Sequence, residues 1–226
     1  MRRLTMLLAL AVSTALAVAT AVIAGPAAPL PTKNLVENPR AELGPATPDS
    51  AEAALPVPSW NVSRGFHARA YNGYRWAPDA KDRTKGSGAK FFVGCFPTSG
   101  QEVTAGSAEQ TVSVSPWAGA IDAGTVALQF SAELGGYNGR ENRATAEVAF
   151  LGGGGKPVAV KSGRKKLLRL VGPTYLERQG ITRVEPRSAT APVPTGTRQL
   201  KVKLAGGGIP CGFIDNVSAV LVKVAK

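Results

Sequence analysis

Apolar residues recur at every second position in several segments of this chain, and this alternation constrains the fold more than any other feature. In the clearest segment, Val126 to Leu134, apolar side chains alternate with smaller or polar ones. The same period returns in residues 111–115, 145–150 and 199–204. A period of two sends successive side chains to opposite faces of a strand, so each segment is predicted to be a half-buried β-strand.

Turn residues separate these segments, and no long helical pattern interrupts them. The expected turns are Gly135–Gly136, Gly152–Gly155, Gly172–Pro173, Pro194–Gly196 and Gly206–Gly208. The run from Val217 to Val224 is apolar at nearly every position, as in a strand that is buried on both faces. Many short strands with glycine and proline turns predict an all-β protein, an antiparallel β-sandwich or barrel.

The N-terminus has the pattern of an export signal. Arg2 and Arg3 precede an apolar, uncharged run from Leu4 to Ala24, which is typical of a secretory signal peptide cleaved after Ala24. The run is also about as long as a membrane span of roughly 20 residues, so an uncleaved N-terminal anchor is the alternative. We therefore expect a signal peptide at 1–24, a Pro-rich linker at 25–32 and one secreted domain at 33–226.

Two cysteines, Cys95 and Cys211, are all that the chain contains. An even number of cysteines in an exported protein favours a disulfide, and two buried thiols are the alternative. A bridge closing so long a loop would stabilise the fold by roughly 4 to 5 kcal/mol, less any strain. A Cys/His metal site would need more ligands than these cysteines and the single histidine, His67, provide.

Positive charge dominates, with 27 Lys and Arg against 15 Asp and Glu. Such a balance favours anionic partners, including acidic glycans, cell-wall polymers, lipid head groups and nucleic acid. The densest basic stretch is Lys161 to Arg169, with Lys156 shortly before it. It either binds a polyanion or forms a solvated hairpin or edge strand whose lysines discourage strand pairing. No base-stacking or groove-reading motif accompanies this charge, so specific binding of nucleic acid is not expected.

The sequence does not favour an enzyme. The glycines before Lys156 are followed by Pro157 rather than by Ser or Thr and a helix, so they form a turn and not a phosphate loop. A Ser-His-Asp triad would have to use His67, yet no strand-to-helix elbow surrounds any serine. We expect His67 at a strand or loop surface.

Several segments, taken in order, resemble the galactose-binding-like jelly-roll fold of many secreted carbohydrate-binding modules. The segments that carry this resemblance are NLVENPRAE (34–42), Trp60, GAKFFVGC (88–95), residues 108–124, 134–157 and 193–204, and FIDNVSAVL (213–221). The resemblance implies a jelly-roll β-sandwich whose first and last strands meet. It also implies a non-catalytic module that binds carbohydrate.

A structural calcium ion is implied by the same resemblance, because such modules often hold one where the first and last strands meet. The matching side chains are Glu42 and Asp215, which should then approach each other. Calcium requires six to eight oxygen ligands, so two carboxylates would have to be joined by several carbonyl groups. In the alternative interpretation Glu42 caps backbone amides, and Asp215 bonds a neighbouring turn or Arg40.

Aromatic side chains in loops are the best candidates for a ligand site, because rings stack on sugars and polar neighbours bond hydroxyls. The first cluster is Tyr71, Tyr74 and Trp76, whose alternative role is to roof one end of the sandwich. The second is Tyr137 with Arg143, which could instead form a polar hairpin with arginine–glutamate pairs.

The predicted function is binding of an extracellular or cell-wall glycan without catalysis. The alternative is a structural or adhesion protein that contacts a protein partner, or an anionic envelope polymer, through the basic surface at Lys156 to Arg169.

Overall fold

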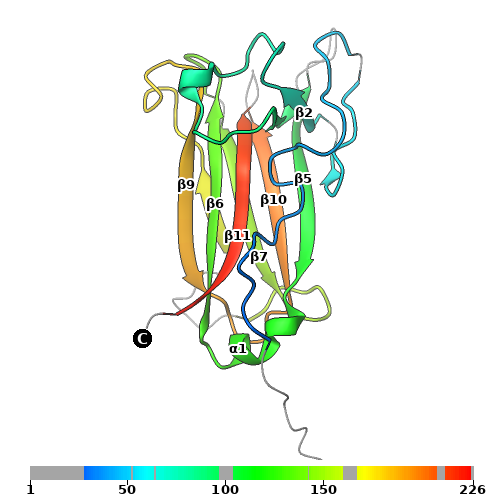
Figure 1. Cartoon of the computed structure of the whole chain (residues 1–226), viewed down its shortest axis with the longest axis vertical. Coiled ribbons are helices and arrows are strands. Elements are labelled where there is room, and N and C mark those ends of the chain that lie inside the picture. The colour runs from blue at the N-terminus through cyan, green and yellow to red at the C-terminus, as the bar shows by residue number, and fades with distance from the viewer. Residues whose placement is uncertain are drawn as a thin grey trace, which may run out of the picture.

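The chain forms two antiparallel β-sheets packed face to face (Figure 1). The computed structural model describes residues 28–51, 53–63, 65–96, 104–141, 143–159, 167–207 and 212–224. The expected signal peptide and most of the linker lie outside these ranges. No helix in the described ranges has the length and apolarity needed to cross a bilayer.

The first sheet has the strand order β1-β5-β10-β7-β8, with β4 also paired to β5. The second sheet has the order β2-β3-β11-β6-β9. The first comprises β1 (Asn61–Val62), β4 (Cys95–Phe96), β5 (Thr104–Ser113), β7 (Arg143–Leu151), β8 (Leu167–Val171) and β10 (Gln199–Gly207). The second comprises β2 (His67–Ala70), β3 (Lys90–Val93), β6 (Val126–Gly136), β9 (Arg183–Pro192) and β11 (Phe213–Lys223).

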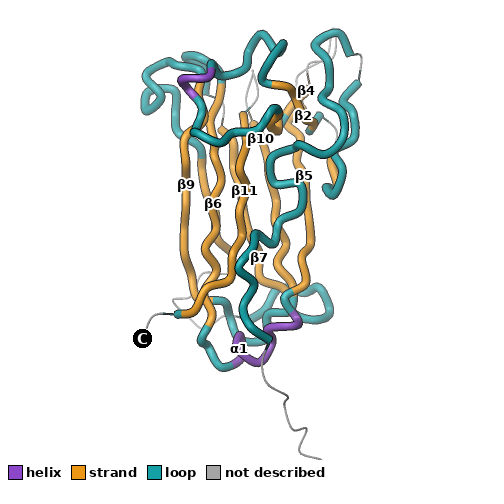
Figure 2. The backbone as a smooth tube through the Cα atoms, viewed as in Figure 1, coloured by secondary structure: helices purple, strands orange, loops and turns teal. Residues whose placement is uncertain are grey.

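The predicted β-sandwich is confirmed, and the alternation seen in the sequence builds its core. In β6, the side chains of Val126, Leu128, Phe130 and Leu134 are buried in the main hydrophobic cluster. The inward residues of β5, β7, β10 and β11 join them between the sheets. Helical structure in the described part is short: η1 (Ala80–Asp82), η2 (Ser115–Trp117) and α1 (Ala118–Asp122) (Figure 2).

Two predicted turns are wrong, because Gly135 and Gly136 continue β6, and Gly206 and Gly207 continue β10. A Cβ atom at Gly135 would overlap the backbone carbonyl of Arg183 on β9. This glycine therefore permits close approach of two strands, whereas the turn itself follows at residues 137–141. The turn at Gly152 to Gly155 is confirmed by a hydrogen bond from the Gly155 N–H to the Gly152 carbonyl.

The opening segment, residues 34–42, closes the sandwich but is not a strand. β3 pairs with only the first two residues of β11, and Asn34 and Leu35 bond to β11 beyond that point. The Gln110 side chain of β5 bonds the backbone of Glu37 from the other sheet. The segment therefore joins the two sheets, and in Figure 1 it is the blue trace beside β11.

A β-bulge in β11 changes the phase of its alternation. The register with β6 shifts between Asp215 and Ser218, and Asn216 adopts a left-handed φ of 48°. Asparagine tolerates this conformation better than most residues. As a result, Ile214 and Val217 both face the core, and Asp215 faces the opposite side of the sheet.

The burial of Trp60 and His67 bears on two further predictions from the sequence. Trp60 is a core residue as expected, with its indole N–H bonded to the Asn38 carbonyl. His67 is fully buried on β2, so the expected surface position is wrong. Its ring bonds the Gly65 carbonyl and the Arg69 guanidinium, and these bonds make burial possible.

Candidate functional site

The outer face of the second sheet carries a small aromatic cluster at one end of the sandwich. Phe91, Val93 and Phe213 lie on this face, whereas their chain neighbours Phe92 and Ile214 point into the main core. The Phe91 and Phe213 rings meet edge to face at 5.2 Å. These apolar side chains would form an exposed hydrophobic patch unless another segment covered them.

The segment from Tyr71 to Ala89, which joins β2 to β3, supplies that cover. It crosses the upper end of the sheet in Figures 1 and 2, and η1 lies on its path. The Tyr71 ring stacks on Phe91 at 4.5 Å, and Tyr74 packs edge-on against Phe213 at 6.5 Å. Burial raises the pKa of both tyrosine hydroxyls, that of Tyr74 to about 12.

Trp76 and Tyr137 come together at the margin of this cluster. Their ring centroids are 6.2 Å apart, and both side chains are half-buried. The buried Arg178 fixes the loop of Tyr137, because its guanidinium donates to the carbonyls of Gly136, Asn138 and Arg140. Two half-exposed rings from separate segments thus form one surface.

Two carboxyl groups lie beneath the aromatic cover, directly opposite each other on β11 and β6. Asp215 is fully buried and accepts hydrogen bonds from the Tyr71 hydroxyl at 2.8 Å and its neighbouring Asn216 N–H at 2.7 Å. Glu133 accepts from the Asn216 carboxamide at 2.8 Å. Burial raises the pKa of Asp215 to about 7, although these donors lower it.

The resemblance implies that Glu42 and Asp215 hold a structural calcium ion. Glu42 and Asp215 do lie close enough for Glu42 to raise the pKa of Asp215. Glu42 accepts the Lys90 N–H at 3.0 Å, and each oxygen of Asp215 accepts one hydrogen bond. Within the described ranges no group of three acidic, His or Cys side chains converges, so carbonyl groups would have to complete a calcium site. Calcium at Glu42 and Asp215 therefore stays a prediction. Arg40 bonds the Gly86 carbonyl rather than Asp215.

A pocket of about 430 Å³ opens beside the aromatic cover, with Tyr71 and Tyr74 in its wall. Arg75 and Arg83 also line it, together with Asn72 and Asp79. The Arg83 guanidinium lies 4.3 Å from the Tyr71 ring centroid, and that of Arg75 lies 4.6 Å from the Trp76 ring. The pocket thus combines ring surfaces, two cations and groups that can bond hydroxyls.

The structure gathers four of the five predicted ligand residues at one end of the sandwich. The expected role of Tyr71 and Tyr74 as exposed platforms is corrected, because each side chain is only 7% exposed and their rings roof the sheet. Trp76 and Tyr137 keep an exposed surface. Arg143 begins β7, but its side chain lies outside the described part.

Sequence reasoning missed Arg75 and Arg83 as pocket residues. Their positions next to Trp76 and within the same polar segment were visible in the sequence. Only the fold shows that each lies over a ring. The polar-hairpin alternative for Tyr137 is not supported for Glu133, because that carboxylate faces Asn216 instead of Arg140.

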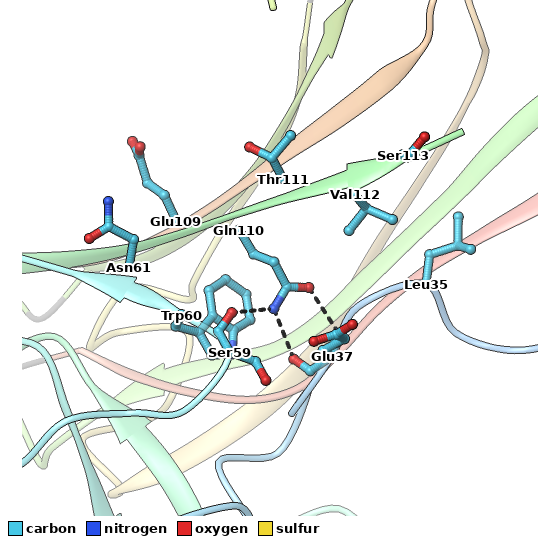
Figure 3. Close-up of a pocket in the computed structure, with 10 residues that line it drawn as sticks. All are labelled: Leu35, Glu37, Ser59, Trp60, Asn61, Glu109, Gln110, Thr111, Val112 and Ser113. Atoms are coloured by element: carbon cyan, nitrogen blue, oxygen red, sulfur yellow. Dashed lines mark hydrogen bonds between the residues drawn. The ribbon is translucent and has the colours of Figure 1, made fainter. Parts of the chain in front are cut away.

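Two other pockets offer weaker sites. One of about 560 Å³ lies between the opening segment and β5 (Figure 3), where Gln110 bonds Glu37 and Ser59 and so seals the seam between the sheets. The other, of about 590 Å³, lies on the outer face of the first sheet. Its cations, Arg169 and Lys203, already pair with glutamates.

Cys95 is buried in the aromatic cluster, whereas Cys211 lies outside the described residues. The neighbouring residues approach each other, since the Gly94 N–H bonds the Gly212 carbonyl at 3.2 Å. This proximity favours the bridge, which remains a prediction. Residues 160–166, which include most of the basic stretch, also lie outside the described ranges, and β8, which follows them, is an edge strand.

The comparisons with known proteins concern the fold alone. No protein-family model matches the sequence, and no curated protein matches it significantly. The enzymatically active domain of tailspike protein 4 from bacteriophage CBA120 matches with a TM-score of 0.52 and 16% identity, over 84% of this chain and only 21% of that one. The module TmCBM61, solved with beta-1,4-galactotriose, matches with a TM-score of 0.44 and 14% identity, over 85% of this chain and 100% of that one.

An adhesin domain, the K2 domain of Lys-gingipain, matches with a TM-score of 0.40 and 7% identity over 79% of this chain and 95% of that one. Carbohydrate-binding modules are thus among the structural neighbours of this β-sandwich. At these identities the likeness extends to architecture and not to ligands.

Proposed function

We propose that this protein is a secreted, non-catalytic module that binds an extracellular glycan at the loop end of its sandwich. The observation that carries the proposal is the meeting of Trp76 and Tyr137, half-exposed, beside a pocket with polar walls. Half-exposed rings offer apolar faces on which sugar rings stack. Asn72 and Asp79 supply groups that bond sugar hydroxyls.

Absence of catalysis is part of the proposal. Glycoside cleavage usually needs two carboxyl groups that flank the scissile bond. Among the described residues that line the pocket, Asp79 is the only acidic one. Asp215 and Glu133 do face each other, but they lie beneath the tyrosine cover and not in the wall of the pocket.

A glycan array probed with the secreted protein tests the proposal, followed by measurement of Kd for each sugar that binds. Trp76→Ala should weaken binding by about tenfold or more, as expected for an aromatic anchor. Trp117→Ala is the matched control, because Trp117 is also half-buried but lies at the opposite end of the sandwich beside α1. Its Kd should remain within about twofold of the wild type, since surface changes away from a site have small effects.

Other outcomes would count against the proposal. Failure to bind any glycan would remove it. Salt-sensitive binding to every polyanion, unchanged by Trp76→Ala, would favour the rival function, an adhesion protein that uses the basic stretch from Lys156 to Arg169.

A further inference from the structure

Arg75 and Arg83 are cations that the protein places at the pocket without neutralising them. Among the described residues neither guanidinium has a carboxylate within ion-pair distance. Elsewhere the contrast is clear: Arg169 pairs with Glu147, Arg187 with Glu185 and Arg198 with Asp122. The pocket therefore presents two positive charges against the single negative charge of Asp79.

Both guanidinium groups lie over rings, and the backbone N–H of Arg75 also bonds the Asp49 carboxylate at 3.5 Å. Arg83 lies over Tyr71, whose hydroxyl is fixed by Asp215, and Arg75 lies over Trp76, which contacts Tyr74. A cation above a ring face keeps its position while its N–H groups stay available to another partner. The planar fork of a guanidinium matches the paired oxygens of a carboxylate or sulfate.

We infer that the ligand of this pocket is an acidic saccharide, whose carboxylate or sulfate group is bound by Arg75 and Arg83. This inference rests on the proposed function and narrows it from glycans in general to acidic ones. The neutral part of the sugar would contact Asn72, Asp79 and the neighbouring rings. Arg83 is half-buried against Tyr71, whereas Arg75 is exposed, so Arg83 is the first of the two to test.

Matched pairs of saccharides test this assignment by isothermal titration calorimetry on the whole secreted protein. One pair is an oligogalacturonate and its fully methyl-esterified form, which share a backbone and differ in the carboxylate charge. The second pair is a sulfated galactan oligosaccharide and its desulfated form. In at least one pair the acidic member should bind at least about tenfold more tightly than its neutral partner, the gain expected of charge-assisted hydrogen bonds. The pair that shows the difference identifies the anionic group.

Three variants locate the effect. Arg83→Gln should abolish most of the preference for the acidic form over the neutral one, because its charge-assisted bonds are lost. Arg83→Lys keeps the charge without the planar fork, so its preference for the acidic form should lie between those of the wild type and Arg83→Gln. Arg187→Gln removes the same charge from the edge strand β9 and should change nothing, because Arg187 is paired with Glu185.

Each remaining outcome overturns the inference in a recognisable way. Equal binding of the acidic and neutral forms would remove the preference for acidic sugars and leave the glycan-binding proposal intact. Equal loss in Arg83→Gln and Arg187→Gln would show diffuse attraction to a basic protein instead of a site. Binding of neither form would count against both the inference and the proposed function.

Discussion

The second sheet buries neighbouring residues of the same strand on both of its faces, and the two faces differ in what covers them. Phe92 and Ile214 face the main core between the sheets, where Phe92 also meets the rings of Trp60 and Phe66. Phe91 and Phe213 face outward and are covered by the segment from Tyr71 to Ala89. All four side chains are fully buried, so burial alone does not distinguish the faces.

The two faces differ in the polar groups that their covers bring to them. The inner face is sealed by a sheet, which leaves no access to solvent. The outer face is sealed by a loop, which brings the Tyr71 hydroxyl to Asp215 and opens a pocket lined by arginines. Because loops tolerate polar and strained conformations better than strands, the candidate site lies on the outer cluster and not in the larger core.

The largest effect expected at the outer cluster is that of reducing the predicted bridge between Cys95 and Cys211. Loss of the bridge should lower the free energy of unfolding by about 4 to 5 kcal/mol, less any strain, since it would close a long loop. Chemical denaturation with and without reductant measures the effect, and the mass of the secreted protein reports the oxidation state. A mass showing two free thiols would remove the prediction.

Alanine substitutions of the neighbouring Phe91 and Phe92 test whether the two faces of the sheet differ. Phe92→Ala and Phe91→Ala should each cost about 3 to 5 kcal/mol, because each empties a buried site. Only Phe91→Ala should also loosen the aromatic cover, because Phe91 stacks on Tyr71. Urea denaturation gives the free energies, and amide hydrogen exchange in residues 71–89 reports the cover. Equally faster exchange of this segment in both variants would contradict the distinction between the faces.

Removal of one hydroxyl tests the polar layer beneath the cover. Tyr71→Phe should cost about 1 to 3 kcal/mol, because it deprives the buried Asp215 of a donor. The matched control is Tyr74→Phe, at a ring of the same exposure whose hydroxyl has no hydrogen bond among the described residues. Its cost should stay within about 0.5 kcal/mol. Equal costs in urea denaturation at pH 8 would show that the bond to Asp215 adds no stability.

The sequence predicted the inner face far better than the outer one. Period-two alternation in residues 126–134 identifies the buried side of β6, since that pattern depends only on local geometry. It cannot show that Phe91 and Phe213 meet, because their pairing depends on the register of β3 with β11. Nor could it show that Tyr71 lies inward and Trp76 partly outward. These positions depend on how one loop crosses the sheet, and the residues of a loop follow no period.

Two buried titratable groups of this sheet, Asp215 and His67, should give opposite pH dependences of stability. Burial raises the pKa of Asp215 to about 7, so the folded state binds more protons than the unfolded state from about pH 4 to 7, and stability falls as the pH rises. Burial lowers the pKa of His67 to about 4, so the folded state binds fewer protons up to about pH 6.5, and stability rises. In the wild type these trends oppose each other over almost the same range. The melting temperature should therefore change little between about pH 4 and 6.5.

Each trend becomes visible when the other group is removed. In Asp215→Asn the melting temperature should rise from about pH 4 to 6.5, and in His67→Gln it should fall over the same range. Each slope should approach about 1.4 kcal/mol per pH unit in the free energy of unfolding, the value for one proton. The slopes are independent of how much either substitution destabilises the fold, so a general loss of stability cannot imitate them. Parallel slopes in the two variants would mean that Asp215 and His67 do not titrate as their burial on β11 and β2 requires.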